Sequence, residues 1–90
     1  MKEYTLDFTK KAEVHIKKLK KLGDKAIVKK LEELFHELRK HPRTGTGKPK
    51  FLKYEKCWSR RIDNNHRLCY EIYDDKVIVL ILTAQGHYIE

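Results

Sequence analysis

The sequence predicts an α+β fold, in which a small antiparallel β-sheet has a helical hairpin packed on one face in the order β-α-α-β-β-β. Three observations favour this fold class. Apolar residues recur at helical spacing between residues 8 and 41, residues 57–72 pair as a hairpin with one apolar face, and residues 77–84 are almost entirely apolar. The 90 residues suffice for one modest core, so we expect a single domain over residues 1–90.

The N-terminal segment predicts a strand and a first helix. Residues 2–6 alternate in polarity, which is typical of a short strand with Tyr4 and Leu6 on one side. Asp7 or Thr9 can cap the helix that follows. Lysines cover most of this helix, and its apolar stripe is expected to consist of Phe8, Ala12, Ile16, Leu19 and Leu22.

A second helix is expected from Lys25 to His41. Asp24 is a good N-cap residue, and Gly23 before it suits a tight turn between two helices. Pro42 ends the helix because a proline cannot continue the hydrogen-bond pattern. Its buried side is expected to consist of Ile27, Leu31, Leu34, Phe35 and Leu38.

Residues 42–50 predict a loop, since they hold two glycines and two prolines. A short extended segment begins at Phe51. Positive charge is dense in this region, where six basic residues and one glutamate between Lys48 and Arg61 give a net charge of +5 over fourteen residues.

The hydrophobic pattern sets the register of the hairpin between residues 57 and 70. A two-residue turn would mix apolar and charged residues on both faces. A three-residue loop over residues 63–65 instead pairs Trp58 with Tyr70 and Arg61 with Arg67, and it favours a left-handed last residue, here Asn65. The core face then carries Trp58, Ile62, Leu68, Tyr70 and Ile72, and the other face carries Ser59, Arg61, Arg67 and Cys69.

Arg61 and Arg67 are the strongest candidates for a binding site. Like charges directly opposite each other destabilise a sheet, and an anionic ligand would offset that cost. A guanidinium donates bidentately to phosphate and keeps its charge. The alternative is a pair of solvated arginines, or arginines that pair with glutamates.

The last strand, residues 77–84, is expected to be central and buried on both faces because it is apolar throughout. A two-residue turn before it would pair Ile72 with Val77. In that register the C-terminal tail leaves the sheet beside the two arginines and brings His87 and Tyr88 to the same end. Histidine suits proton transfer, and tyrosine can stack on a base or donate to a phosphate oxygen.

Composition limits the classes of partner and compartment. Lys and Arg number 21 against 13 Asp and Glu, a net charge of +8 that favours nucleic acid, a membrane surface or an acidic protein. No apolar run is long enough to span a membrane and no signal peptide begins the chain, so we expect a cytoplasmic protein. Cys57 and Cys69 are expected to stay reduced. No ligand spacing suggests a metal, and no cofactor is expected.

Several other side chains have structural interpretations. His15, His36 and His41 are expected to pack at the surface or at an edge, and His66 is expected to be structural. The lysines of the first helix predict a solvated face, or else a field that attracts RNA. The segment GTGKPK lacks the full phosphate-loop pattern and a following helix, which argues against nucleotide binding.

The chain resembles the RelE superfamily of toxin ribonucleases, in particular its Txe/YoeB branch. The resemblance spans nearly the whole chain and is carried by GTGKP, by LK at 52–53, by WSRRI at 58–62, by HRLCY at 66–70, by DD at 74–75 and by HY at 87–88. It implies a ribosome-dependent endoribonuclease that cuts mRNA in the ribosomal A site. It also implies a cognate acidic antitoxin of the YefM type, with a homodimer left open.

The resemblance also implies roles for individual residues. Arg67 is similar to the arginine that stabilises the scissile phosphate, and Arg61 to a second phosphate-binding arginine. His87 is similar to the general acid for the leaving 5′ oxygen, and Tyr88 to a residue that orients or stacks on the RNA. Two lysines of the basic segment, Lys48 and Lys53, complete the expected phosphate-binding set.

One position departs from that branch. Relatives have a glutamate general base where this chain has Lys50. The implied reaction is metal-independent attack of a 2′-OH on the adjacent phosphate, which gives a 2′,3′-cyclic phosphate and needs a base at the 2′-OH. Lys50 is therefore expected in the catalytic set as base, with Glu55 as the nearest carboxylate. The alternative is a weakened or inactive module that binds RNA or an antitoxin with the same arginine face.

Overall fold

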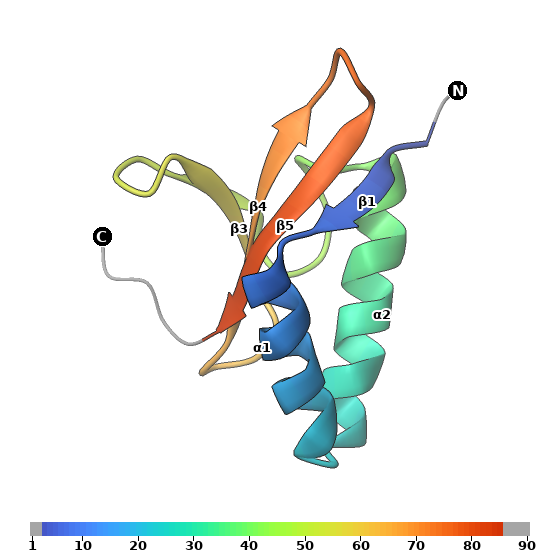
Figure 1. The fold of residues 1–90 in the computed structure, drawn as a ribbon, viewed down its shortest axis with the longest axis vertical. Helices are drawn as coiled ribbons and strands as arrows, with labels where there is room; N and C mark the ends of the chain where they lie inside the picture. The colour runs from blue at the N-terminus through green and yellow to red at the C-terminus, as the bar shows by residue number, and fades with distance from the viewer. Residues whose placement is uncertain (1–2, 86–90) are drawn as a thin grey trace.

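The computed structural model describes residues 3–85 of the chain, as two helices and a five-stranded sheet (Figure 1). The sheet has the strand order β1-β5-β4-β3-β2. The elements are β1 (Thr5–Phe8), α1 (Lys10–Lys21), α2 (Lys25–Lys40), β2 (Lys50–Leu52), β3 (Cys57–Arg61), β4 (Arg67–Tyr73) and β5 (Ile78–Gln85). The predicted α+β class, with a helical hairpin against a sheet, is confirmed.

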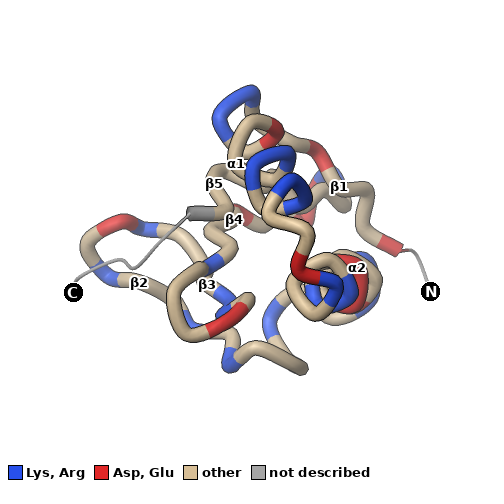
Figure 2. Tube along the Cα trace, turned by 90° about the horizontal axis from the view of Figure 1, so that it is seen from below, with Lys and Arg blue, Asp and Glu red and all other residues tan. Residues whose placement is uncertain are grey.

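The sheet differs from the prediction in two ways. It is mixed, because β1 pairs parallel with β5 while the other neighbours are antiparallel. The extended segment at Phe51 is a full strand, β2, which pairs with β3 and lengthens the order to β-α-α-β-β-β-β. The helices cover the β1-β5-β4 part, and the β2–β3 hairpin projects beyond them (Figures 1 and 2).

The two helices begin at the residues that the sequence indicates. Thr9 caps α1 by accepting a hydrogen bond from the Ala12 N–H (3.0 Å), and Asp24 caps α2 by accepting from the Ala26 N–H (2.9 Å). The predicted stripe of α1 is too long at both ends. Phe8 lies in β1 with its ring against Phe35, and Leu22 is 64% exposed just after the helix.

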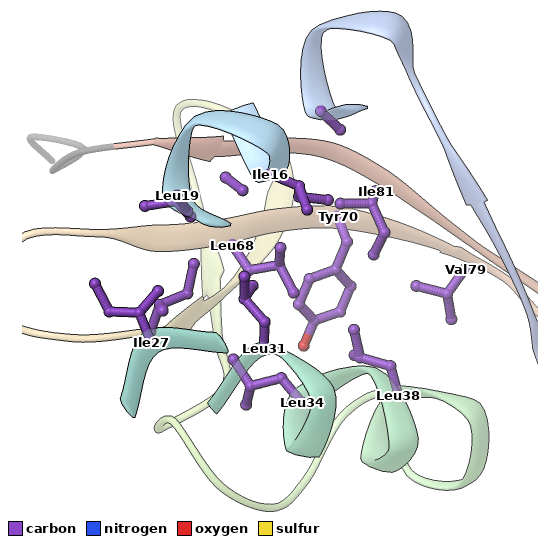
Figure 3. Close-up of a cluster of buried hydrophobic side chains, with 13 residues drawn as sticks. Ile16, Leu19, Ile27, Leu31, Leu34, Leu38, Leu68, Tyr70, Val79 and Ile81 are labelled. Atoms are coloured by element: carbon purple, nitrogen blue, oxygen red, sulfur yellow. The ribbon is translucent and has the colours of Figure 1, made fainter. Parts of the chain in front are cut away.

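The core lies between the two helices and one face of β4 and β5 (Figure 3). Leu31, Leu34 and Leu38 of α2 are fully buried, as the helical spacing predicts, while Phe35 is only half-buried. Tyr70 stands among them, and Figure 3 shows its hydroxyl directed toward α2. The other described members of this cluster are Ala12, Ile16, Leu19, Ile27, Ile62, Leu68, Val79, Ile81 and Ala84.

The predicted register of the β3–β4 hairpin is confirmed. Trp58 pairs with Tyr70, and Arg61 pairs with Arg67. The predicted left-handed residue is wrong, because the non-glycine residues with positive φ in the described range are Lys48, Lys56 and Val77. The Asp63 carboxylate holds the loop instead, since it accepts hydrogen bonds from the backbone N–H groups of Asn65 (2.8 Å) and His66 (2.7 Å).

The predicted register of β4 with β5 is wrong by two residues from Tyr70 to Tyr73 and by three from Arg67 to Cys69, because the register shifts between Cys69 and Tyr70. Ile72 pairs with Val79, and a four-residue connection that includes Val77 at φ 53° replaces the tight turn. A shift of two keeps every side chain on its face, so the hydrophobic pattern cannot distinguish the two registers between Tyr70 and Tyr73. β5 is central as predicted, but only one of its faces is deeply buried, since Ile78, Leu80 and Leu82 are half-buried.

The expectation of two reduced cysteines is contradicted. Cys57 and Cys69 form a disulfide whose Cα atoms lie 6.3 Å apart across β3 and β4. The two residues are diagonal neighbours, because Cys69 pairs with Ser59. Together with Leu52 and Leu82 they form a small apolar cluster separate from the main core. No helix within residues 3–85 is long and apolar enough to cross a membrane.

Candidate functional site

The sheet face that carries Arg61 and Arg67 holds most of the predicted site residues. The two arginines are directly opposite each other, and both are half-buried. The backbone of Gln85 is the β5 partner of Arg67, so the last described residue of the chain lies at this end of the sheet. The predicted convergence of β5 on the arginine pair is therefore confirmed, although the register that predicted it is wrong.

Lys50 lies one row away from the arginines. It pairs with Ser59 in β3, and Ser59 in turn pairs with Cys69 in β4. Residues two apart on a strand share a face, and diagonal neighbours on adjacent strands lie about 7 to 8 Å apart at their Cα atoms. Lys50 is thus within reach of a ligand bound between Arg61 and Arg67.

Two buried polar atoms on this face have no hydrogen-bond partner among residues 3–85. They are the Oγ of Ser59 and the Nε of Arg67. A third buried atom without a partner in this range is the Oε2 of Glu55, which lies in the β2–β3 turn. Buried polar groups almost always have a partner, so each such atom calls for an explanation. At Arg67 the free donor belongs to the guanidinium that is expected to contact phosphate.

A buried arginine that the sequence analysis did not consider, Arg60, lies on the opposite face. It is 0% exposed and pairs with Leu68. Its Nε donates to the Tyr70 hydroxyl (3.1 Å), and one terminal nitrogen pairs with the Glu37 carboxylate (2.9 Å). The sequence did indicate that Arg60 is buried, because the predicted register places this charged residue between Trp58 and Ile62 on the core face.

The α2–β2 loop wraps around this guanidinium. Arg60 donates to the carbonyl oxygens of His41, Thr44 (2.7 Å) and Thr46 (3.2 Å). Burial opposes ionisation of Glu37, but hydrogen bonds from Thr46 and Arg60 outweigh it, so the pKa of Glu37 lies below its usual value.

The same loop is joined directly to Arg61. The Arg61 N–H donates to the carbonyl oxygen of Gly47 (2.7 Å). Gly47 has φ +85°, and a Cβ added there would lie 2.8 Å from the Arg61 carbonyl oxygen, so only glycine fits at this close approach. This contact holds Lys48, the next residue, beside the arginine pair.

The remaining predicted site residues are not all brought together. Lys53 follows β2 at its far end, roughly 10 Å along the chain from Lys50 at about 3.3 Å per residue, and it is exposed. The predicted grouping of Lys53 with the arginines is therefore not seen. His87 and Tyr88 lie outside the described residues.

Two histidines have defined partners. His66 contacts the Asp63 carboxylate through Nδ1 (2.9 Å), in line with its predicted structural role. His15 accepts a hydrogen bond at Nδ1 from the Ala84 N–H (3.1 Å), next to the end of β5. Burial, with smaller effects from nearby lysines, lowers the pKa of His15 and favours the neutral ring that this contact needs.

Positive charge is concentrated on the β2–β3 hairpin and on α1. Figure 2 shows lysine and arginine segments along the β2–β3 hairpin and on α1. The arginine face therefore lies in a positive field, which suits a polyanionic ligand.

Comparison with known proteins identifies the class. Residues 8–88 match the family described as the YoeB-like toxin of bacterial type II toxin-antitoxin systems. Toxin YoeB of Escherichia coli K12 is 46% identical over 67 residues, which cover 72% of this chain and 77% of that protein. Toxin RelK of Mycobacterium tuberculosis is 40% identical over 68 residues, covering 73% and 78%.

Solved structures agree with the sequence relatives. The YoeB dimer from Staphylococcus aureus superposes with a TM-score of 0.80 at 32% identity, covering 96% of this chain and 99% of that one. A YoeB/ParE toxin from Agrobacterium tumefaciens gives a TM-score of 0.84 at 27% identity, covering 93% and 99%. The fold and the matches define a toxin of a type II toxin–antitoxin system. Within that class, the chain belongs to the YoeB-like toxin family.

Proposed function

We propose that this toxin is a ribosome-dependent endoribonuclease that cleaves mRNA in the ribosomal A site and so inhibits translation. The observation that carries the proposal is the Arg61–Arg67 pair, two half-buried arginines directly opposite each other on the sheet face away from the helices. Such a pair is unfavourable without an anion and suits the phosphate of an RNA backbone.

The proposed reaction needs no metal. The 2′-oxygen attacks the adjacent phosphorus, the bond from phosphorus to the 5′-oxygen breaks, and a 2′,3′-cyclic phosphate forms. A base takes the 2′-OH proton, and an acid, for which we propose His87, gives a proton to the leaving 5′-oxygen. Arg67 and Arg61 stabilise the negative charge on the phosphate oxygens in the transition state, and Tyr88 orients the RNA.

Lys50 is the proposed base. Its register position, opposite Ser59 and one row from the arginines, is on the face where the 2′-OH would lie. A lysine must first lose a proton, so cleavage should be slower at neutral pH than with a carboxylate in this place. Glu55 is the second candidate, because its half-buried carboxylate has an oxygen without a partner among residues 3–85.

The proposed partners are the ribosome with its mRNA and an acidic antitoxin. A solved relative is a heterotetrameric YoeB-YefM complex from Staphylococcus aureus, with a TM-score of 0.76 and 33% identity. An acidic YefM-like segment would complement the net charge of +8 of this chain. A homodimer is the corresponding proposal for the free toxin, since the Staphylococcus aureus YoeB relative was solved as a dimer.

A second candidate function is a binding module that holds RNA or the antitoxin without cutting. Lys50 favours this binding function, because the lysine occupies the position at which the resemblance places a glutamate base. Expression from a repressible promoter separates the two. Growth arrest with new 5′ ends within coding regions, both absent in Arg67→Ala, supports the nuclease, and normal growth with intact transcripts supports the binding module.

A further inference from the structure

Two consecutive arginines of β3 serve opposite faces of the sheet. Arg61 faces the candidate site, whereas Arg60 is fully buried on the helix side. Burying a charge this deeply is costly unless it is paired and hydrogen-bonded. Arg60 meets both conditions, because it contacts the Glu37 carboxylate, the Tyr70 hydroxyl and backbone carbonyls of the α2–β2 loop.

We propose that Arg60 is a positioning residue of the nuclease site, which, with Glu37, fixes the α2–β2 loop and thereby sets the positions of Lys48, Lys50 and the Arg61 backbone. The inference rests on the proposed function for its catalytic meaning. It adds a role for a residue that touches neither RNA nor the reacting atoms.

The loop depends on this guanidinium for its shape. Between α2 and β2 it has no regular structure, and Gly45 and Gly47 adopt φ angles of +121° and +85°. Three of its carbonyl oxygens converge on Arg60, and Glu37 holds the Thr46 N–H (2.7 Å) and the Thr46 hydroxyl (2.5 Å). A planar guanidinium has five N–H donors in a fixed fork, which the compact ammonium of a lysine cannot reproduce.

The loop is also the physical link to the site. The Gly47 carbonyl accepts from the Arg61 N–H, and β2 follows the loop directly, with Lys50 as its first residue. A shift of the loop therefore moves Lys50 and the Arg61 backbone together. A misplacement of about 1 Å in catalytic groups costs about 10²-fold in rate, even when it originates outside the chemistry.

The test compares Arg60→Lys with the parent toxin and with Arg43→Lys as a matched control. Arg43 belongs to the same loop and also makes a guanidinium–carboxylate pair, but with exposed Asp74 (2.7 Å). The measurements are single-turnover cleavage on programmed ribosomes, affinity for ribosomes carrying 2′-O-methyl mRNA, and amide hydrogen exchange. Because the 2′-O-methyl group blocks the attack of the 2′-oxygen, the affinity is measured without cleavage.

We expect Arg60→Lys to lower the single-turnover rate by about 10- to 100-fold while the affinity changes by less than about threefold, and Arg43→Lys to match the parent. Exchange at the amides of Thr46 and Arg61 should accelerate by about tenfold or more, with Val79 in the core unchanged. Faster local exchange with a parental cleavage rate would overturn the proposal. So would a variant that is only less stable overall, without local change at these two amides.

A second variant covers the case in which Arg60→Lys does not fold. Glu37→Gln keeps the guanidinium and its carbonyl contacts but removes the negative charge of its half-buried partner, so we expect smaller changes in the same direction. Parental rate and exchange in Glu37→Gln would then contradict the inference. If the parent toxin itself does not cleave RNA, the proposed function fails, and the exchange at Thr46 and Arg61 alone decides whether Arg60 fixes the loop.

Discussion

Replacement of Tyr70 by phenylalanine tests the buried polar network directly. Tyr70 is 0% exposed, its hydroxyl donates to the Pro42 carbonyl (2.8 Å), and it accepts from the Arg60 Nε (3.1 Å). Burial is the main reason that the pKa of Tyr70 is raised, so the hydroxyl keeps its proton and can donate. In the variant, the buried Pro42 carbonyl and the Nε–H of the buried Arg60 guanidinium lose their partner.

The expected loss follows from those two contacts. A buried polar group that loses its partner costs about 1 to 3 kcal/mol, so the two groups together should lower the free energy of unfolding of Tyr70→Phe by about 2 to 6 kcal/mol. For a domain of this size that corresponds to a fall in Tm of about 10 to 45 °C. Urea titration followed by circular dichroism measures it, with an unchanged m-value showing that the loss is in the folded state.

Tyr73→Phe is the matched control. Its hydroxyl donates to Glu71 (2.6 Å) at an exposed position, so its removal should change the free energy of unfolding by less than about 0.5 kcal/mol. Equal effects in the two variants would refute the assignment of Tyr70 and Arg60 to one buried network.

Three further predictions concern the site and its surroundings. Lys50→Glu should raise the single-turnover rate at neutral pH and flatten its rise between pH 6 and 9, because a carboxylate is already ionised there. If the variant is slower and the rate of the parent toxin does not change over this pH range, Lys50 is a phosphate ligand instead. Ribosome binding should weaken steeply with salt, since each phosphate contacted by residues 48–61 adds about 0.7 to 0.9 to the log–log slope, and a slope near zero would rule out this electrostatic footprint. The pKa of His15 is lowered in the folded state, so its contribution to stability is present above the unfolded pKa of about 6.5 and is lost as the pH falls through the folded value. His15→Gln should remove this part of the pH dependence of the free energy of unfolding. Identical curves of stability against pH for the parent and the variant would contradict it.

The sequence carried enough information to locate the arginine pair. The β3–β4 register follows from a period-2 pattern in which a slip of one residue would set Ile62 opposite Arg67 and Arg61 opposite Leu68, so that charged and apolar residues would share each face. Such a slip is strongly disfavoured, so hydrophobicity alone decided it. The helices were equally accessible, because Thr9, Asp24 and Pro42 mark their ends.

The errors have physical causes that the pattern does not contain. From Tyr70 to Tyr73 the β4–β5 register was wrong by two because both registers keep the same side chains in the core, and neither the four-residue connection through Val77 nor the register shift after Cys69 is signalled by a glycine. The parallel pairing of β1 with β5 depends on where α1 and α2 return the chain. The predicted register did place Arg60 on the core face, but its partners could not be inferred, because Glu37 and the loop carbonyls lie 14 to 23 residues away in the sequence.

The central claim is that the face carrying Arg61 and Arg67 cleaves RNA by attack of the 2′-OH. The most direct measurement is the chemistry of the product ends after incubation with programmed ribosomes. The account predicts a 2′,3′-cyclic phosphate on the upstream fragment, no cut when the scissile nucleotide is 2′-deoxy, and a rate about 10²- to 10³-fold lower in folded Arg67→Ala. Cleavage of the 2′-deoxy substrate, or a parental rate in Arg67→Ala, would contradict it.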